Sequence, residues 1–506
     1  MNQLLTGAEY LESLRDGRNV YLNGEKIPDV TQHPAFRNSA LSIARMYDAL
    51  HDPETRDLLT GVDDFGTRTH QFFKPAKSAQ DLLAAREAIA HWQRLGYGFM
   101  GRTPDYKASF MAGLAVNADY YGPYAANAMR WYKAFTEKAL YLNHVIINPP
   151  LNRAKPIHEM GDEFIHAVRE TDQGVIVSGA KMLATGSAVT HASFVAPVGS
   201  AVLEPGKAEA FAMVFFVRMN NPKLRLLCRK PYGAGAPFDH PLSSRFDEND
   251  AVLILDEALI PWEDVLVYRD IERSTGFYAK SGFPNLYNFQ SAIRLATKLE
   301  FMAGLLSRAV KANGTDGFRG VQAAVGELIT MRDMIWALTT AMALDPEPST
   351  GDTVVPKLEY ASAIRIYNAQ VWGRVHELFE TNLGGSPIVV PSSHQDLLSP
   401  ELRPLIDRYY HGANCEALER VQLLKLVWDV IGSDFGGRDE LYERNFSGNA
   451  EQVRLDALKW STKRGSLARY EAFVQQCMDD YDLDGWKRGP WVDESQSRQE
   501  RQVCVE

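Results

Sequence analysis

The chain has 506 residues, of which 45% are hydrophobic and 10% aromatic, and its formal net charge is −10. The length suffices for roughly two to four domains with sizeable cores, and the composition excludes an intrinsically disordered chain. The negative charge argues against a broad nucleic-acid interface, which needs a basic face.

The N-terminus lacks the basic and then apolar pattern of a signal peptide. No apolar run reaches the roughly 18 residues of a membrane-spanning helix. The four cysteines are scattered without a CxxC spacing, so neither a disulfide framework nor a zinc knuckle is indicated. The sequence therefore predicts a cytoplasmic protein without a membrane partner.

The first region of the chain, residues 1–144, is predicted to be mostly helical. Ser78 is a typical N-cap, because apolar residues at helical spacing follow it. These residues are Leu82, Ala85, Ile89 and Trp92. A second helical segment is predicted within residues 126–143.

The middle region, residues 145–275, consists of short β-branched and aromatic runs separated by Gly, Ser and Pro turns, which predicts antiparallel strands in a barrel or sandwich. The last region, residues 276–506, returns to the helical period and is predicted to form a bundle with a tail. One apolar stripe is Leu295, Leu299, Met302 and Leu306; a second is Val421, Leu424, Val427 or Trp428, and Ile431. The predicted fold class is α+β, mostly α.

Several common catalytic motifs are absent from the sequence. GAGAPF, at 233–238, breaks the dinucleotide-binding pattern after its second glycine, and no phosphate-binding loop or nucleophile elbow is found. HEMGDEFIH, at 158–166, places Asp162 where a zinc protease helix has its second histidine. No metal site is predicted.

Two short stretches carry candidate functional side chains: MGRTPDY, at 100–106, and YLNHVIINPPLNR, at 141–153. Arg102 lies in a turn-prone segment where its guanidinium can bind an anion or a phenolic oxygen, and Tyr106 follows with a hydroxyl donor. His144, in a half-apolar loop, can exchange a proton near neutral pH. Taken singly, such residues are more often a surface ion-pair partner and a structural histidine.

Both stretches, with others in the same order along the chain, resemble the oxygenase component of 4-hydroxyphenylacetate 3-monooxygenase, a family of two-component phenol hydroxylases that use reduced flavin. The matching segments are residues 101–106, 141–153, 177–191, 240–270, 318–327 and 423–448. The resemblance covers essentially the whole chain.

This resemblance implies an acyl-CoA dehydrogenase-like fold with an N-terminal helical domain (1–144), a central β-barrel domain (145–275) and a C-terminal four-helix bundle with a tail (276–506). It implies that a separate NAD(P)H:flavin reductase supplies reduced FAD, and that O2 is the co-substrate. The reaction would pass through a C4a-hydroperoxyflavin and convert a para-substituted phenol to a catechol. A homotetramer or homodimer is expected.

The resemblance also assigns site residues. Arg102, Tyr106 and His144 would surround the phenol oxygen, with His144 accepting its proton, and Gly199 and Ser200 would also contact the substrate. The implied flavin contacts are Arg102, His144, Val145, Ile146, Pro150, Leu151, Asn152, Arg153, Thr185, Ser447, Gly448 and Asn449.

Two segments of the chain leave the identity of the substrate undecided. Residues 228–245 are a few residues shorter than the family pattern, and residues 199–210 fall where the family varies. Besides 4-hydroxyphenylacetate, the alternatives are coumarate- or coumarin-type phenols, chlorophenols and carrier-tethered tyrosine. Two alternatives of other classes are an acyl-CoA dehydrogenase-like flavoprotein and a non-catalytic scaffold with the same fold.

Overall fold

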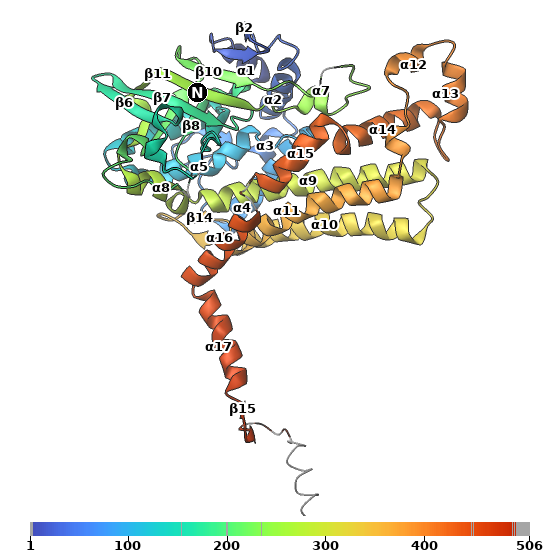
Figure 1. Ribbon diagram of the computed structural model, residues 1–506. Coiled ribbons are helices and arrows are strands. Elements are labelled where there is room, and N and C mark those ends of the chain that lie inside the picture. The colour runs from blue at the N-terminus through green and yellow to red at the C-terminus, as the bar shows by residue number, and fades with distance from the viewer. Residues whose placement is uncertain are drawn as a thin grey trace, which may run out of the picture. The chain divides into compact units, whose positions relative to one another are not determined.

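The computed structural model describes residues 4–152, 154–198, 201–233, 235–446, 448, 450–487, 489 and 491, without the side chains of Phe110 and Ala279. The chain divides into two compact units, Met1–Ser447 and Gly448–Glu506 (Figure 1). None of the helices described is long and apolar enough to cross a membrane.

The first region contains the predicted helices. They are α1 (Gly7–Ser13), α2 (Arg37–Ala49), α3 (Arg56–Leu59), α4 (Ala79–Leu95), α5 (Pro104–Val116) and α6 (Ala125–Lys138). Ser78 caps α4 as predicted, because its hydroxyl accepts a hydrogen bond from the backbone N–H of Asp81 at 3.2 Å. All four predicted apolar residues of α4 are buried.

The first region also contributes strands that the sequence analysis did not predict. β1 (Val20–Leu22) and β2 (Glu25–Ile27) form a hairpin, and β1 pairs in parallel with β10 (Leu224–Cys228). A second hairpin joins β3 (Thr60–Val62) to β4 (Arg68–His70). Part of the N-terminal region therefore belongs to the central sheet.

The middle region forms two sheets. A six-stranded sheet has the order β2-β1-β10-β11-β7-β6, and a four-stranded sheet has the order β12-β9-β8-β5. Their remaining strands are β5 (Leu142–Val145), β6 (His166–Thr171), β7 (Gly174–Met182), β8 (Ala192–Val195), β9 (Met213–Arg218), β11 (Ala251–Pro261) and β12 (Val265–Tyr268). Antiparallel pairing dominates as predicted, but β5 pairs with β8 in parallel, because the chain visits the other sheet between these two strands.

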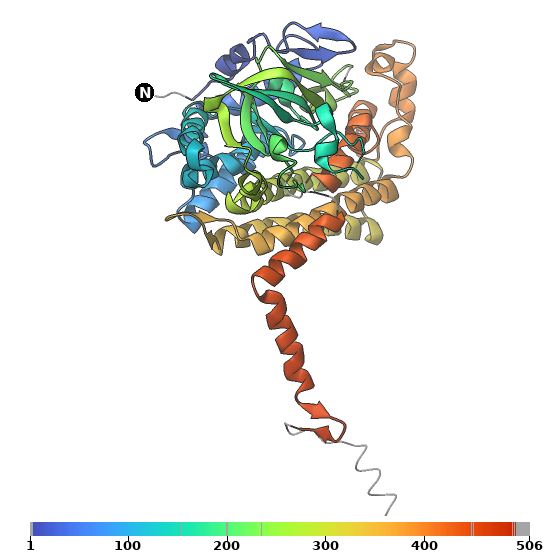
Figure 2. The ribbon, with the colours of Figure 1, turned by 60° about the vertical axis from the view of Figure 1, so that its left-hand side comes forward.

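The third region forms the helical bundle. Its helices are α9 (Phe283–Ala312), α10 (Arg319–Leu344), α11 (Leu358–Leu383), α14 (Ala417–Ile431) and α15 (Asp434–Asn445). The strands of the two large sheets are grouped above the long helices of the same unit in Figure 2. The stripe on α9 is buried as predicted, and on α14 Val427 is buried whereas Trp428 is 41% exposed.

Short elements complete the first unit. They are α7 (Ser243–Phe246), α8 (Ile271–Lys280), β13 (Glu347–Pro348), β14 (Val354–Val355), α12 (His394–Leu398) and α13 (Arg403–Tyr409). One continuous hydrophobic core includes Trp92 of α4, Phe216 of β9 and Leu299 of α9. The three predicted regions share this core, and their division into domains at residues 144 and 275 stays a prediction.

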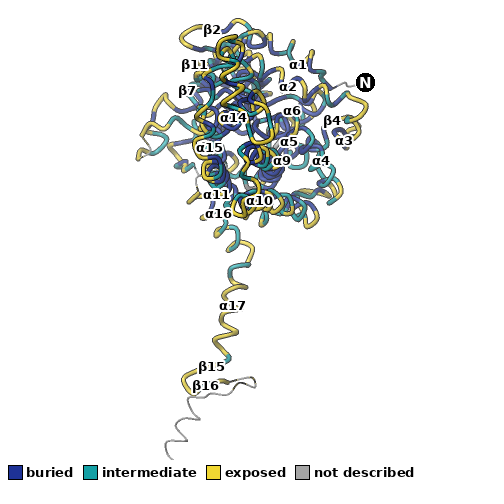
Figure 3. Tube along the Cα trace, turned by 90° about the vertical axis from the view of Figure 1, so that its right-hand side faces the viewer, coloured by how far each residue is buried: buried dark blue, intermediate teal, exposed yellow. Residues whose placement is uncertain are grey.

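The second unit contains α16 (Ala450–Lys463), α17 (Ser466–Met478) and a hairpin of β15 (Tyr481–Asp482) with β16 (Gly485–Trp486). No residue of α17 is buried, and most of this helix is exposed in Figure 3.

Candidate active site

The candidate site starts at the N-terminus of α5. Thr103 is the N-cap residue and Pro104 the first helical residue, a position that suits proline because no N–H is needed there. Arg102 therefore lies directly before the helix, and Tyr106 lies in its first turn. The turn-prone segment is a turn at Gly101 and Arg102, whereas Tyr106 belongs to the helix that Pro104 begins.

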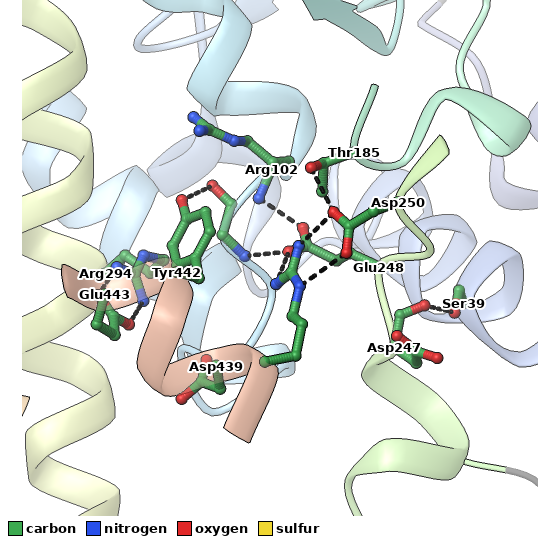
Figure 4. Close-up of polar contacts among 12 residues, drawn as sticks. Ser39, Arg102, Thr185, Asp247, Glu248, Asp250, Arg294, Asp439, Tyr442 and Glu443 are labelled. Carbon is green, nitrogen blue, oxygen red and sulfur yellow. Dashed lines mark hydrogen bonds and ion pairs between the residues drawn. The ribbon is translucent and has the colours of Figure 1, made fainter. Parts of the chain in front are cut away.

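The backbone at Gly101 and Arg102 is held from several sides. The carboxylate of Glu248 accepts hydrogen bonds from both N–H groups, at 2.8 Å from Gly101 and 2.5 Å from Arg102. The hydroxyl of Tyr141 donates to the Arg102 carbonyl at 2.6 Å, and that of Tyr442 donates to the Gly101 carbonyl at 3.2 Å. In Figure 4 the Arg102 side chain points away from Glu248.

Gly101 gives Tyr442 room to approach. A Cβ atom at position 101 would lie 2.3 Å from Cζ of Tyr442, far inside contact distance. The glycine of the GRTPDY motif is therefore needed for the ring that lines this site.

The guanidinium of Arg102 lies among aromatic rings and keeps one donor unused. Its Cζ is 4.1 Å from the ring centroid of Tyr106 and 5.2 Å from that of Tyr442. Burial disfavours its charge, but Tyr106, Tyr442 and Glu248 outweigh burial and raise the pKa of Arg102. Its Nη1 is buried and has no hydrogen-bond partner among the described residues, so the site presents a fixed cation with a free donor.

His144 lies in β5 and faces the same cluster. Its ring centroid is 6.0 Å from that of Tyr106 and 6.2 Å from that of Phe283. The structure thus brings Arg102, Tyr106 and His144 together, and their contact with a phenol stays a prediction. His144 is part of a strand and not of a loop, because its segment pairs with β8.

The protonation of His144 differs from the sequence-based expectation. Burial, and then the neighbouring cations Lys107 and Arg102, lower the pKa of His144 well below its ordinary value of 6.5. His144 is therefore neutral at physiological pH.

The sequence analysis missed four residues that build this site: Lys107, Tyr141, Glu248 and Tyr442. One of them had a signal in the sequence. Lys107 is the basic residue of a helix that is mostly apolar, and a helix with apolar residues on all sides is usually buried. Glu248 and Tyr442 lie 146 and 341 residues away from their partners in the chain, so only the fold brings them to the site.

The segment after β5 contains the next predicted contacts. Val145 is buried, Ile146 is half-buried, and the turn of Pro150, Leu151 and Asn152 is exposed. The buried Lys181 of β7 holds this segment by donating to the Ile146 carbonyl at 3.2 Å and to Oδ1 of Asn148 at 2.7 Å.

Six predicted contacts are not placed at this site. Arg153, Gly199, Ser200, Ser447 and Asn449 lie outside the described residues. Gly448 belongs to the second unit.

Thr185 takes part in a buried ionic network. Its hydroxyl donates to Asp250 at 2.6 Å, and Asp250 also accepts hydrogen bonds from Arg229 and Arg438, each at 2.9 Å. Although burial favours the neutral acid, Arg438 and Arg229 hold the pKa of Asp250 well below its ordinary value. Arg438 lies 3.6 Å from Glu248, so this network connects Thr185 to the carboxylate that fixes Arg102 (Figure 4).

Comparison with known proteins identifies the family. Models of the 4-hydroxyphenylacetate 3-hydroxylase N-terminal and C-terminal regions match residues 6–267 and 274–475. The chain is 63% identical to the pyoverdin chromophore biosynthetic protein PvcC of Pseudomonas aeruginosa, over 97% of this chain and 98% of that one. It is 50% identical to the oxygenase component of 4-nitrophenol 2-monooxygenase of a Rhodococcus species, over 96% of this chain and 94% of that one.

A solved structure agrees with these relatives. The oxygenase component of 4-hydroxyphenylacetate 3-monooxygenase, complexed with FAD and 4-hydroxyphenylacetate, matches with a TM-score of 0.88 and 32% identity, over 94% of this chain and 99% of that chain. The fold and the site therefore define a flavin-dependent monooxygenase with an acyl-CoA dehydrogenase-like fold. The chain belongs to the 4-hydroxyphenylacetate 3-hydroxylase family, which confirms the predicted family, fold class and enzyme class.

Proposed function

We propose that this enzyme hydroxylates a para-substituted phenol next to its hydroxyl group and so produces a catechol, using reduced FAD and O2. The observation that carries the proposal is the unused, buried Nη1 of Arg102 beside Tyr106 and His144. A fixed cation with a free donor is suited to a phenolate oxygen.

The residues present fit a flavin. The free donor of Arg102 calls for a polar ligand, and the segment from Val145 to Asn152 offers backbone groups on a support that Lys181 holds in place. We propose that Arg102, His144, Val145, Ile146 and the turn at Pro150, Leu151, Asn152 and Arg153 hold the cofactor, with Thr185 and with Ser447, Gly448 and Asn449. When bound, reduced flavin supplies the activated form of oxygen.

Each residue near the phenol has a separate task. Arg102 stabilises the phenolate, which makes the ortho carbon electron-rich, and Tyr106 donates a hydrogen bond to the same oxygen. His144, neutral at physiological pH, accepts the phenol proton. Tyr278, Phe283 and Tyr287 form aromatic contacts next to this group and exclude water from it.

The partners follow from the same proposal. A separate NAD(P)H:flavin reductase supplies the reduced cofactor, and the enzyme acts as a homotetramer or homodimer in the cytoplasm. We propose 4-hydroxyphenylacetate as the first substrate to test, because the structural relative is complexed with it. 4-Nitrophenol is the second, because it is named for the Rhodococcus relative. Residues Gly199 and Ser200 stay proposed substrate contacts.

The test is an assay of para-substituted phenols with the full-length protein, a flavin reductase, NADH, FAD and O2. We expect catechol formation that depends on both the protein and the reductase. Oxidation of an acyl-CoA thioester in place of phenol hydroxylation would contradict the proposal, as would NADH consumption without any hydroxylated product.

Thr185→Ala should increase the fraction of oxygen that is released as hydrogen peroxide. The proposed hydrogen bond between the Thr185 hydroxyl and the flavin is worth on the order of 1 kcal/mol, so its loss should raise this fraction several-fold. Hydrogen peroxide and catechol are measured in the same reaction, and Thr185→Ser, which keeps the hydroxyl, should restore the ratio. An unchanged ratio would show that the hydroxyl serves only Asp250, with which it is bonded.

A further inference from the structure

Lys107 is a buried lysine without a carboxylate partner. It lies in the first turns of α5 and is 1% exposed. None of the ion pairs found among the described residues includes it. Since an unpaired buried charge is costly, a lysine here needs an explanation beyond packing.

The neighbours of Lys107 oppose its positive charge. Its Nζ lies 4.0 Å from the ring centroid of Tyr106, the ring that Arg102 also contacts. Burial, and then the charge of Arg102, lower the pKa of Lys107 well below its ordinary value, while Glu248 opposes this shift in part. These surroundings favour a neutral amine, which can accept a proton.

Lys107 contacts His144, the proposed acceptor of the phenol proton. Its Nζ is hydrogen-bonded to Nδ1 of His144. No described residue forms a hydrogen bond with the other ring nitrogen of His144, Nε2, so Nε2 is the atom open to a ligand. His144 thus connects the space beside Arg102 and Tyr106 to the buried amine.

His144 can transfer a proton but is a poor place to keep it. Burial and the neighbouring charge of Arg102 disfavour an imidazolium here. A proton accepted at Nε2 therefore needs a further acceptor, and the amine of Lys107 is in contact with Nδ1.

We propose that Lys107 is the terminal acceptor of the phenol proton and receives it through His144. The inference rests on the proposed function. The phenol O–H bond breaks as a bond forms between its proton and Nε2, while the Nδ1–H bond breaks and a new N–H bond forms at Nζ. His144 changes from one neutral tautomer to the other, Lys107 becomes an ammonium group, and the phenolate remains beside Arg102. No electrons move to or from a co-reactant.

Few charged or aromatic groups surround the pair of Lys107 and His144. Helix α5 contributes Tyr106, the turn directly before α5 contributes Arg102, and the segment before β11 contributes Glu248. From α9, Phe283 packs on His144 and Tyr287 packs on Tyr106. The pair therefore titrates as a unit in the field of one arginine and one carboxylate.

The test compares Lys107→Met and Lys107→Arg with the parent. Met removes the acceptor, and Arg keeps a positive charge but does not release its proton in proteins, so it is unable to accept one. Lys133→Met, at an exposed lysine of α6, is the control for removing a lysine. Hydroxylation is measured across pH with the reductase system, for 4-hydroxyphenylacetate and for the more acidic 4-nitrophenol.

With 4-hydroxyphenylacetate, both Lys107 variants should lose roughly 10²-fold or more of the parent's rate, the usual contribution of a proton acceptor. The parent's rate should rise with pH as the pair loses its proton, and this rise should disappear in both variants. With 4-nitrophenol at a pH where it is already ionised, both variants should stay within about threefold of the parent, since no proton remains to be accepted.

Folding is checked by the thermal midpoint, which should stay near that of the parent in Lys107→Met because an apolar side chain replaces a buried amine that has no carboxylate partner. Parent-like hydroxylation of 4-hydroxyphenylacetate by Lys107→Arg would overturn the proposal, because only charge would then matter. Equal losses for both phenols would overturn it as well. If the parent hydroxylates neither phenol, the proposed function itself fails, and the inference falls with it.

Discussion

Arg102→Ala is expected to reduce phenol hydroxylation by roughly 10²- to 10³-fold, the usual effect of removing one preorganised electrostatic donor. The substitution removes the fixed charge and the unused Nη1 donor, but it leaves the backbone bonds to Glu248 and Tyr141, which do not involve the side chain. Product formation should therefore fall by a larger factor than the affinity for FAD. Catechol is measured by chromatography, and FAD binding by fluorescence quenching.

Two arginine variants are controls for this result. Arg15→Ala removes an exposed arginine whose partners are Glu12 and Asp29, and it should keep the parent's rate. Arg102→Lys keeps a charge without the planar fork and should recover only part of the rate. If Arg102→Ala weakens FAD binding as much as it slows hydroxylation, Arg102 serves the cofactor and not the phenol oxygen.

Glu443→Ala is expected to lower the free energy of unfolding by about 3 to 5 kcal/mol, the usual effect of leaving buried charges without their partner. Glu443 is fully buried between α15 and α9 and accepts hydrogen bonds from Arg294 at 2.6 Å and 2.7 Å and from Lys298 at 2.8 Å. Without it, two cations remain buried beside Asp439 alone. Urea denaturation monitored by circular dichroism measures the loss.

This ion cluster also predicts a pH dependence. Burial favours the protonated form, but Arg294 and Lys298 outweigh it and lower the pKa of Glu443 from its ordinary value of 4.5 to about 2. Because the folded pKa is depressed, the stabilisation is complete above the unfolded pKa and is lost as the pH falls toward the folded one. The penalty of Glu443→Ala should therefore shrink as the pH falls from 4.5 toward 2.

Glu327→Ala is the matched control for Glu443→Ala. Glu327 also pairs with an arginine through two hydrogen bonds, to Arg374 at 2.7 Å and 2.8 Å, but its side chain is 38% exposed. An exposed pair contributes at most about 1 kcal/mol, so its loss should be small. Similar losses of unfolding free energy for both variants would show that burial does not determine how strongly the Glu443 cluster stabilises the fold.

Much of the fold could be predicted from local patterns. The Ser78 cap and the stripe from Leu295 to Leu306 both follow from helical spacing, and both are found where the sequence places them. The parallel pairing of β1 with β10 could not be predicted, because three-residue β1 has almost no periodic signal and its partner lies 206 residues away. The sequence also left open whether Val427 or Trp428 continues the buried stripe of α14, and only the packing of this helix shows that Val427 does.

The candidate site was predictable only where a motif marked it. Arg102, Tyr106 and His144 lie in motifs, and the structure brings them together. Glu248 and Tyr442 bind the backbone of Gly101 through contacts that no local pattern encodes. The low pKa of His144 was also not predictable, because it arises from burial and from Lys107, which lies in α5 and not in the strand of His144.

The central claim, that this site binds a phenol as the phenolate, is tested most directly by the absorbance of 4-nitrophenol bound to the full-length protein without flavin. The phenol and the phenolate absorb differently, so a pH titration reports the ionisation of the bound molecule alone. The site predicts that bound 4-nitrophenol ionises at a lower pH than free 4-nitrophenol, and that Arg102→Ala moves the transition back upward. A bound phenol that ionises at the same or a higher pH than the free one would contradict this account.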